Sequence, residues 1–454
     1  MLPADWSVRL VDATVRKLTD KHLAWADCAF ISGMVVQRES AQKIIARCNA
    51  AGVRVVAGGP LFTSEHEDFD GGVDHFVLNE AEVTLPQFLS DLAEGCAKRI
   101  YTSTEFADIR QSPTPRWDLA ELSRYASMSI QYSRGCPYDC EFCNVTTLFG
   151  RSWRTKTTDQ VIAELDGLYA AGWRGGVFFV DDNLIGNRRA LKKDLLPALI
   201  EWQKGKDIPL QTQLSIDLAD DEPLTKMMVD AGFRTVFIGI ETPDEESLSE
   251  CNKRQNKGRN LVDDVKRLQR AGLEVQGGFI VGFDHDLADI FQRQIDFIQR
   301  SGIVTAMVGL LQAPPGTRLY DRLQKEDRLQ AQGSGDNVDG TTNIVPIMEL
   351  SALRLGYERI LQTIYSPKQY YKRVRTFLRE YRAPALYGSL DTRHILAFFR
   401  SVLRLGIIGR ERLQYWKLLA WTLFRRPRRF PMAVTFAIYG FHFRKTCKQH
   451  VVAP

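Results

Sequence analysis

The stretch Ser133-Arg134-Gly135-Cys136-Pro137-Tyr138-Asp139-Cys140-Glu141-Phe142-Cys143-Asn144 decides the interpretation of this 454-residue chain. Its cysteines are separated by three and two residues, so one loop could wrap a single metal cluster. Thiolates are soft ligands that suit iron–sulfur clusters. Three of them leave one iron of a [4Fe-4S] cluster open to a small chelating molecule. Cys136, Cys140 and Cys143 are therefore predicted to be the metal ligands and the catalytic centre.

Two other uses of these cysteines fit the sequence less well. A structural zinc site needs a fourth ligand at close spacing. The next downstream cysteine is Cys251 and the next histidine is His285, so no nearby residue supplies that ligand. Three thiols without any metal would be unusual beside Gly135 and Pro137. The sequence favours the iron–sulfur cluster over both.

Strands that alternate with helices predict an α/β fold with parallel sheets. Expected strands in the first part cover 8–11, 28–31, 53–57 and 73–78, and expected helices cover 40–51 and 85–93, the latter with Pro86 in its first turn. From residue 129 to 311 the pattern gives about six strand–helix units, fewer than the eight of a closed barrel. The prediction is a doubly wound domain at 1–97, a linker at 98–127, a partial (β/α)6 TIM-like barrel at 128–313 and a helical basic extension at 314–454.

Composition narrows the class of protein. Hydrophobic residues make up 44% and charged residues 25%, which is ordinary for a globular protein. The eight cysteines are too sparse for a disulfide framework, and Met1–Arg9 has no apolar core of a signal peptide. No run approaches the roughly 20 apolar residues of a membrane span. A cytoplasmic location without a transmembrane segment is expected.

The cysteine spacing after a strand, with Phe142 just before the last cysteine, resembles the radical S-adenosylmethionine (SAM) superfamily over about 125–320. The resemblance implies that the open iron binds SAM. Reductive cleavage of SAM then yields a 5'-deoxyadenosyl radical that takes hydrogen from the substrate. It also implies an electron donor such as flavodoxin or ferredoxin.

The same resemblance implies further cofactor contacts at the ends of strands. The residues concerned are Phe142, Asp181, Asp182, Asn183, Gln213, Glu241, Gly278 and Gly282. For the Asp181–Asn183 segment the alternative is a polar strand end with a helix cap. For Gln213, which shares a strand face with Gln211, it is a hydrogen-bonded core pair, and for Glu241 it is a structural salt bridge. The glycines would let the backbone approach adenine closely.

The α/β domain before the barrel resembles the cobalamin-binding class of the superfamily. Segments 32–34, 58–60 and 79–82 lie where that class has loops at strand ends. No Asp-x-His-x-x-Gly motif is present, so no axial histidine for cobalamin is evident. The chain starts close to the first expected strand, so this domain is expected to lack one strand and to bind cobalamin weakly.

Segments 314–320 and 335–343 resemble an extension shared by a subfamily that includes hopanoid methylases. The favoured function is therefore cobalamin-assisted radical SAM methylation of an unreactive carbon in a small-molecule or lipid-like substrate. One alternative is radical SAM ring closure, carbon–carbon coupling or epimerisation without cobalamin. Another is a non-catalytic, membrane-associated scaffold with a structural cluster.

The C-terminal region has a distinct charge. Residues 371–454 contain 18 Lys or Arg and 3 Asp or Glu, whereas the rest of the chain is mildly acidic. An expected helical stripe of Trp416, Leu419, Ala420, Leu423 and Phe424 precedes Arg425, Arg426, Arg428 and Arg429. An apolar stripe beside basic residues is typical of a helix at a membrane surface. Peripheral contact with the inner face of the membrane is one expectation, and packing of the stripe on the barrel is the alternative. No nucleic-acid-binding module is recognised.

Overall fold

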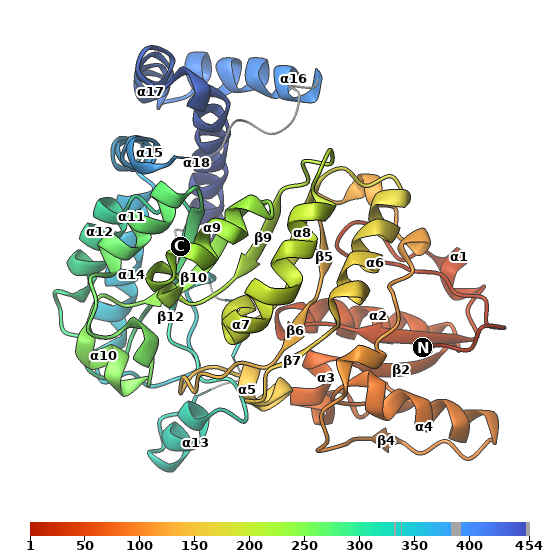
Figure 1. Cartoon of the computed structure of the whole chain (residues 1–454). Helices are drawn as coiled ribbons and strands as arrows, with labels where there is room; N and C mark the ends of the chain where they lie inside the picture. Colours follow the sequence, from red (N-terminus) through yellow and green to blue (C-terminus); the bar gives the residue numbers. More distant parts are fainter. Residues whose placement is uncertain (331–332, 337, 383–391, 451–454) are drawn as a thin grey trace. The chain divides into compact units, whose positions relative to one another are not determined.

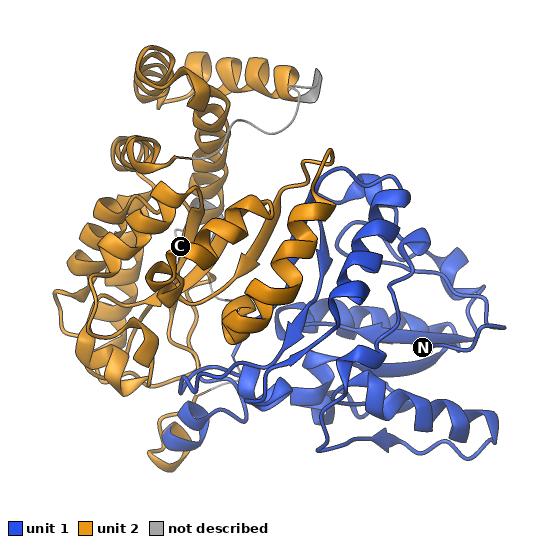
Figure 2. Ribbon diagram, in the orientation of Figure 1, with its two compact units in different colours: residues 1–182, 313–322, 332–336 blue, residues 183–312, 323–331, 337–454 orange. Residues whose placement is uncertain are grey.

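The computed structural model describes residues 1–330, 333–336, 338–382 and 392–450 (Figure 1). It divides into two compact units (Figure 2). Unit 1 holds residues 1–182, 313–322 and 332–336, and unit 2 holds residues 183–312, 323–331 and 337–454. Both contain parallel strands alternating with helices, and the C-terminal part is helical. The predicted α/β class is confirmed.

Unit 1 contains a four-stranded parallel sheet in the order β1-β2-β3-β4. The strands are β1 (Cys28–Ser32), β2 (Arg54–Gly58), β3 (His75–Val77) and β4 (Ile100–Tyr101), and the helices around them are α1 (Asp20–Leu23), α2 (Arg38–Ala50), α3 (Pro60–Glu65) and α4 (Ala81–Ala93). Neighbouring residues of a strand point to opposite faces. Val55 packs with residues of α2 and α3, whereas Val56 packs with residues of α4. Helices therefore cover both faces of this sheet.

Two local predictions for this region are wrong. Residues 8–11 form no strand, and Leu10 is 48% exposed, so this segment lacks the burial expected of a central strand. Helix α4 begins at Ala81, which places Pro86 inside the helix and not in its first turn. Segment 98–127 contains β4, the start of β5 and three short 3-10 helices, η3 (Ile109–Gln111), η4 (Trp117–Leu119) and η5 (Leu122–Arg124).

The rest of unit 1 carries the cysteine loop. Strands β5 (Ser127–Ile130) and β8 (Gly176–Phe179) pair in parallel, while β6 (Ser133–Arg134) and β7 (Arg154–Thr155) form a short antiparallel ladder. Helices α5 (Val145–Phe149) and α6 (Thr158–Ala170) lie between these strands in sequence. Thr157 caps α6, and the side chain of Gln160 reaches back to the Thr157 backbone, which satisfies two backbone groups at once.

Unit 2 contains four parallel strands that follow the chain order β9-β10-β11-β12. They are β9 (Leu210–Gln213), β10 (Phe233–Glu241), β11 (Glu274–Val281) and β12 (Ala306–Leu310). The helices between them are α9 (Glu222–Asp230), α10 (Glu245–Glu250), α11 (Leu261–Ala271) and α12 (Ile290–Ser301), and residues 188–202 form α7, a π-helical turn and α8. With β5 and β8 this gives the six parallel strands expected, which is compatible with a partial barrel.

The C-terminal helices are α13 (Arg318–Lys325), α14 (Leu350–Ile364), α15 (Pro367–Glu380), α16 (Thr392–Ser401), α17 (Arg412–Arg425) and α18 (Phe430–His450). A π-helical segment, η10 (Val402–Ile408), joins α16 to α17. Helix α18 packs against α15, α16 and α17 in unit 2 (Figure 1). Within the described residues, no helix has the length and apolar content needed to cross a membrane. Asn337, in the predicted loop 335–343, lies outside those residues.

Candidate active site

The cysteine loop begins where the β6–β7 ladder ends. Gly135 has φ +90°, and a Cβ atom there would lie 2.5 Å from the Ser152 carbonyl oxygen, so a glycine is needed at this turn. The Cys136 N–H donates to the Gly150 carbonyl at 3.4 Å, and the Cys143 N–H donates to the Cys140 carbonyl at 3.1 Å. The backbone therefore closes the loop on itself and on the segment that follows α5.

Residues 318–322 support the loop from the outside, within unit 1. The Leu319 N–H donates to the Glu141 carbonyl at 3.1 Å. The Arg318 guanidinium donates to the Asp139 carbonyl at 2.6 Å, and Arg322 Nε donates to Glu141 Oε1 at 2.8 Å. The sequence motif at 314–320 indicated a subfamily, and it gave no sign of this contact with the cysteine loop.

The donor set fits a [4Fe-4S] cluster by its chemistry. Cys140 is buried and Cys136 and Cys143 are partly exposed, and all three lie on one eight-residue loop. Across the described ranges, no group of three His, Cys, Asp or Glu side chains is arranged to hold a metal ion. Three thiolates would leave one iron open, as SAM binding needs. The adjacent Phe142 is partly buried.

Arg134, on β6, connects the antiparallel β6–β7 pair, here called the β6–β7 hairpin, to the start of α4. It pairs with Glu80 at 3.2 Å and with Glu82 at 2.8 Å, while Arg154 pairs with Glu80 at 2.8 Å. Burial opposes ionisation of Glu82, but hydrogen bonds from Arg134 and Ser112 outweigh it and lower the Glu82 pKa to about 2. The sequence had assigned 79–82 only to a strand-end loop, so this network was missed.

Asp181 lies directly after β8 and is fully buried. Its carboxylate accepts hydrogen bonds from the Tyr132 N–H at 3.1 Å and from the N–H and hydroxyl of Ser133. Burial raises the pKa of Asp181 to about 7 and that of Asp182 to about 6. These contacts tie β8 to the strand that leads into the cysteine loop. A SAM contact for Asp181 and Asp182 stays a prediction.

In unit 2, two candidates lie near the end of β9. Asn183 is buried, and its Oδ1 accepts from the Ser215 N–H at 3.3 Å. The Gln213 side chain is partly exposed, and its amide has no hydrogen-bond partner in the portion of the chain that the structure describes. Gln211 lies on the same face of the strand, two residues earlier. Gln213 thus keeps a donor and an acceptor available for a ligand.

Glu241 ends β10 at a β-bulge, with φ +62°. Its Oε1 pairs with Lys253 Nζ at 2.6 Å, and both side chains are largely buried. A Cβ atom on Gly239 would lie 2.2 Å from Glu241 Oε1 and 2.9 Å from Lys253 Nζ, so this glycine makes room for the ion pair. The salt-bridge alternative for Glu241 is therefore present, and Lys253 is a site residue that the sequence did not indicate.

The two candidate glycines have different surroundings. A Cβ atom on Gly278 would lie 3.0 Å from the Phe237 ring. Gly282 follows β11 with φ +106°, and its N–H donates to Asp286 Oδ2 at 2.7 Å. Burial raises the pKa of Asp286 to about 6. The three cysteines, Phe142, Asp181 and Asp182 thus lie in unit 1, and the other candidates lie in unit 2.

The sequence of this chain is similar to those of known proteins. The model of the radical SAM superfamily matches residues 130–298, and a domain of unknown function (DUF4070) matches residues 317–453. An uncharacterised methyltransferase of Synechocystis sp. is 39% identical and covers 98% of this chain and 84% of that protein. The hopanoid C-2 methylase of Rhodopseudomonas palustris is 35% identical over 93% of this chain and 82% of that protein. The chain belongs to the radical SAM superfamily.

Solved structures of this superfamily share the fold. OxsB, a cobalamin-dependent SAM radical enzyme, has a TM-score of 0.62 at 16% identity and covers 92% of this chain and 76% of its own. The methyltransferase TsrM from Kitasatospora setae has a TM-score of 0.59 at 16% identity, with 93% and 90% covered. The present chain is a radical SAM C-methyltransferase, as its relatives that match nearly the whole chain indicate. The predicted [4Fe-4S] cluster and SAM are confirmed as its cofactors at the level of the family.

Proposed function

We propose that this enzyme methylates an unreactive carbon of a lipid-like substrate with the help of cobalamin. The observation that carries the proposal is the 35% identity, over 93% of this chain, to a protein named as a hopanoid C-2 methylase. When bound, the cluster supplies the electron that cleaves SAM, and cobalamin supplies a methyl group for transfer. Membrane contact by the C-terminal helices would bring the enzyme to such a substrate.

In unit 1, the sheet edge at the carboxyl ends of β1, β2 and β3 supports the proposal that cobalamin binds. Gly59 has φ +84°, and a Cβ atom there would lie 2.3 Å from Ser32 Oγ, so two strand-end loops meet closely. Next to them Met34 is 58% exposed and Val36 is 52% exposed. An apolar rim on a parallel-sheet edge suits a large flat macrocycle. Since segments 32–34, 58–60 and 79–82 contain no histidine, they would hold cobalamin without an axial imidazole.

The cysteine loop has its own role in this proposal. Cys136, Cys140 and Cys143 would hold the cluster, and the hydrogen bonds from Leu319 and Arg318 would keep the loop backbone in place. Gln213 would orient SAM through its amide. The electron would come from a flavodoxin or ferredoxin.

The test is anaerobic reconstitution of the full chain with iron, sulfide and cobalamin, followed by incubation with reductant, methyl-labelled SAM and a hopanoid lipid. We expect 5'-deoxyadenosine and a labelled, methylated lipid. The Met34→Asp variant should lose bound cobalamin and methylation, because a charge enters the apolar rim, while it keeps its iron. Leu10→Asp, another exposed apolar residue of unit 1, is the matched control. A product of ring closure or epimerisation without methyl label would contradict the proposal.

A further inference from the structure

Helix α16 exposes a stripe of large apolar side chains. Ile395, Leu396 and Phe399 of α16 are 50%, 50% and 63% exposed, and Leu403 in η10 is 54% exposed. Their spacing of one, four and eight residues from the first places them along one side of a helix. Such a stripe would usually pack into a core, and here it faces solvent.

The segment that follows continues this apolar surface. Ile408 at the end of η10 is 71% exposed, and Leu413 at the start of α17 is 69% exposed. Further along α17, Trp416 is 46%, Leu423 53% and Phe424 83% exposed. So many large exposed apolar side chains on successive segments of a chain are uncommon in a monomeric globular protein and mark an interaction site.

The exposed stripe of α17 is not its packing face. Tyr415, Leu418, Leu419 and Thr422 form the buried face of this helix, which packs against α15 and α18. The predicted stripe is therefore corrected at Leu419, which is buried, whereas Trp416, Leu423 and Phe424 remain outside. Because α17 is anchored by one face, its other apolar face is held open.

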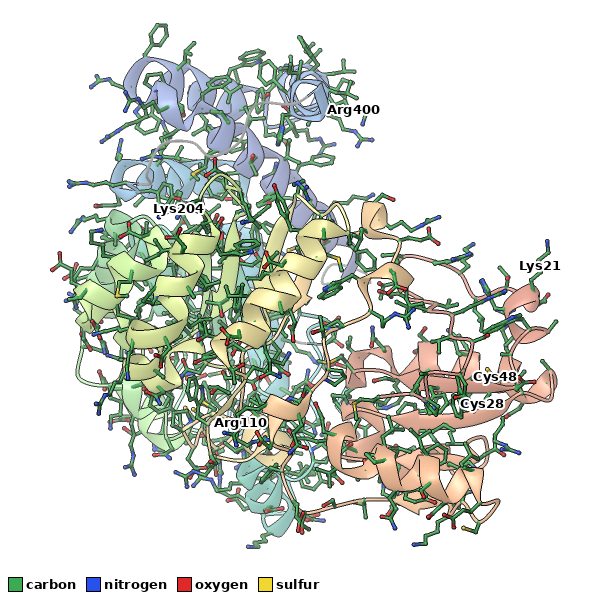
Figure 3. All side chains as sticks on the ribbon, turned by 45° about the vertical axis from the view of Figure 1, so that its right-hand side comes forward. Lys21, Cys28, Cys48, Arg110, Lys204 and Arg400 are labelled. Atoms are coloured by element: carbon green, nitrogen blue, oxygen red, sulfur yellow. The ribbon has the colours of Figure 1, made fainter. Side chains whose placement is uncertain are left out.

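Arginines border the apolar surface at both ends of α17. Arg425, Arg426 and Arg428 are exposed directly after Phe424, and Arg410 and Arg412 are exposed at the other end. Arg400 is exposed near the end of α16 (Figure 3). By contrast, Arg429 lies partly buried over the Tyr381 ring, 5.0 Å from its centroid. Apolar side chains flanked by arginines match the boundary between acyl chains and anionic headgroups.

We propose that α16, η10 and α17 form a docking surface for an anionic lipid membrane. The exposed apolar side chains enter the interfacial layer, and the bordering arginines bind lipid phosphates. A second copy of the chain is a poorer occupant, because two identical faces would bring the same arginines together. The proposal concerns attachment to the membrane and holds whether or not the enzyme uses cobalamin.

The test is flotation of the full chain with two kinds of vesicle, one of phosphatidylcholine alone and one that also contains phosphatidylglycerol. We expect binding to the anionic vesicles that weakens as salt rises. Replacing Arg425, Arg426 and Arg428 by glutamine should weaken partitioning about a hundredfold, since loss of each basic residue should lower the binding constant about fivefold and the three factors multiply. Replacing Ile408 and Phe424 by serine should weaken binding to both kinds of vesicle.

Matched controls use exposed residues of unit 2 outside this surface. Arg189→Gln with Lys193→Gln and Arg300→Gln removes three exposed cations, and Leu287→Ser with Leu355→Ser removes two exposed apolar side chains. These variants should float like the wild type. Negligible binding to both vesicles, or equal losses in the control variants, would overturn the proposal. So would a stable dimer that the Ile408 and Phe424 replacements dissociate while vesicle binding is absent.

Discussion

Arg134, which lies two residues before the first cysteine of the loop, donates a hydrogen bond from its Nη2 to Glu82 Oε1 at 2.8 Å. Both side chains are mostly buried, with exposed fractions of 16% and 13%. The pair joins the first turn of α4 to the β6–β7 hairpin, and Arg154 on the same hairpin pairs with Glu80. These ion pairs connect the region of the four-stranded sheet to β6, which leads into the cysteine loop. A substitution in one of these parts should therefore affect the other.

The Glu82–Arg134 pair should stabilise unit 1 at neutral pH. Because the Glu82 pKa falls from 4.5 to about 2 in the folded chain, the ionised form is favoured by about 3 kcal/mol. We expect Glu82→Gln to lower the free energy of unfolding by about 2–3 kcal/mol at pH 7. The difference should be fully present above pH 4.5 and shrink as the pH falls toward 2. Urea unfolding across this range measures it.

The control for that prediction is Glu67→Gln, which replaces an exposed carboxylate of the same unit. It should change the free energy of unfolding little at any pH. A Glu82→Gln effect that stays constant from pH 7 to pH 3 would contradict the ion-pair account.

The buried pair of Glu241 and Lys253 gives a second prediction. Lys253→Met leaves the Glu241 carboxylate buried without its cation, which should cost about 3–5 kcal/mol of unfolding free energy. Adding Glu241→Gln should restore most of the loss, because no charge then remains to be desolvated. Calorimetry of the two variants beside the wild type measures this. A single variant as stable as the wild type would show that water reaches Glu241.

Gln213 supports a third prediction, for SAM binding. Gln213→Leu removes the amide that has no partner among the described residues, and it should leave stability nearly unchanged. Loss of one hydrogen bond to SAM should raise KM for SAM about tenfold in 5'-deoxyadenosine formation. Gln211→Leu, earlier on the same face of β9, is the matched control. Equal KM values for both variants would remove Gln213 from the SAM site.

Much of the fold followed from periodicity, because strands and helices of this type leave local patterns. The strand predicted over 28–31 lies inside β1, and the helix predicted over 40–51 matches α2 within two residues at either end. Helix α15 falls within the helical extension predicted over 314–454, but its buried face was not predicted. It is dense in basic residues, yet it buries Tyr370, Tyr371 and Arg373 on one side. The many basic residues of α15 made it difficult to recognise from the sequence that the helix is amphipathic and that its buried face contains aromatic side chains.

The candidate active site likewise contains residues that the sequence could predict and residues that it could not. The cysteine loop could be predicted because its ligands are close in sequence and their chemistry is specific. The partners of Glu82 and Leu319 could not, since Arg134 is 52 residues away from Glu82 and Glu141 lies far from Leu319 in the chain. Ion pairs and backbone contacts of this kind depend on the folded topology and leave no local signature.

The central claim is that Cys136, Cys140 and Cys143 hold the cluster that cleaves SAM. The most direct measurement is iron content together with 5'-deoxyadenosine produced from SAM, after anaerobic reconstitution and reduction, for the wild type and the variant with all three cysteines replaced by alanine. Cys96→Ala, which removes an exposed cysteine of the same unit, is the control. We predict that the triple variant loses the reducible cluster and all 5'-deoxyadenosine, while the control keeps both. Undiminished iron and full 5'-deoxyadenosine production by the triple variant would contradict the account.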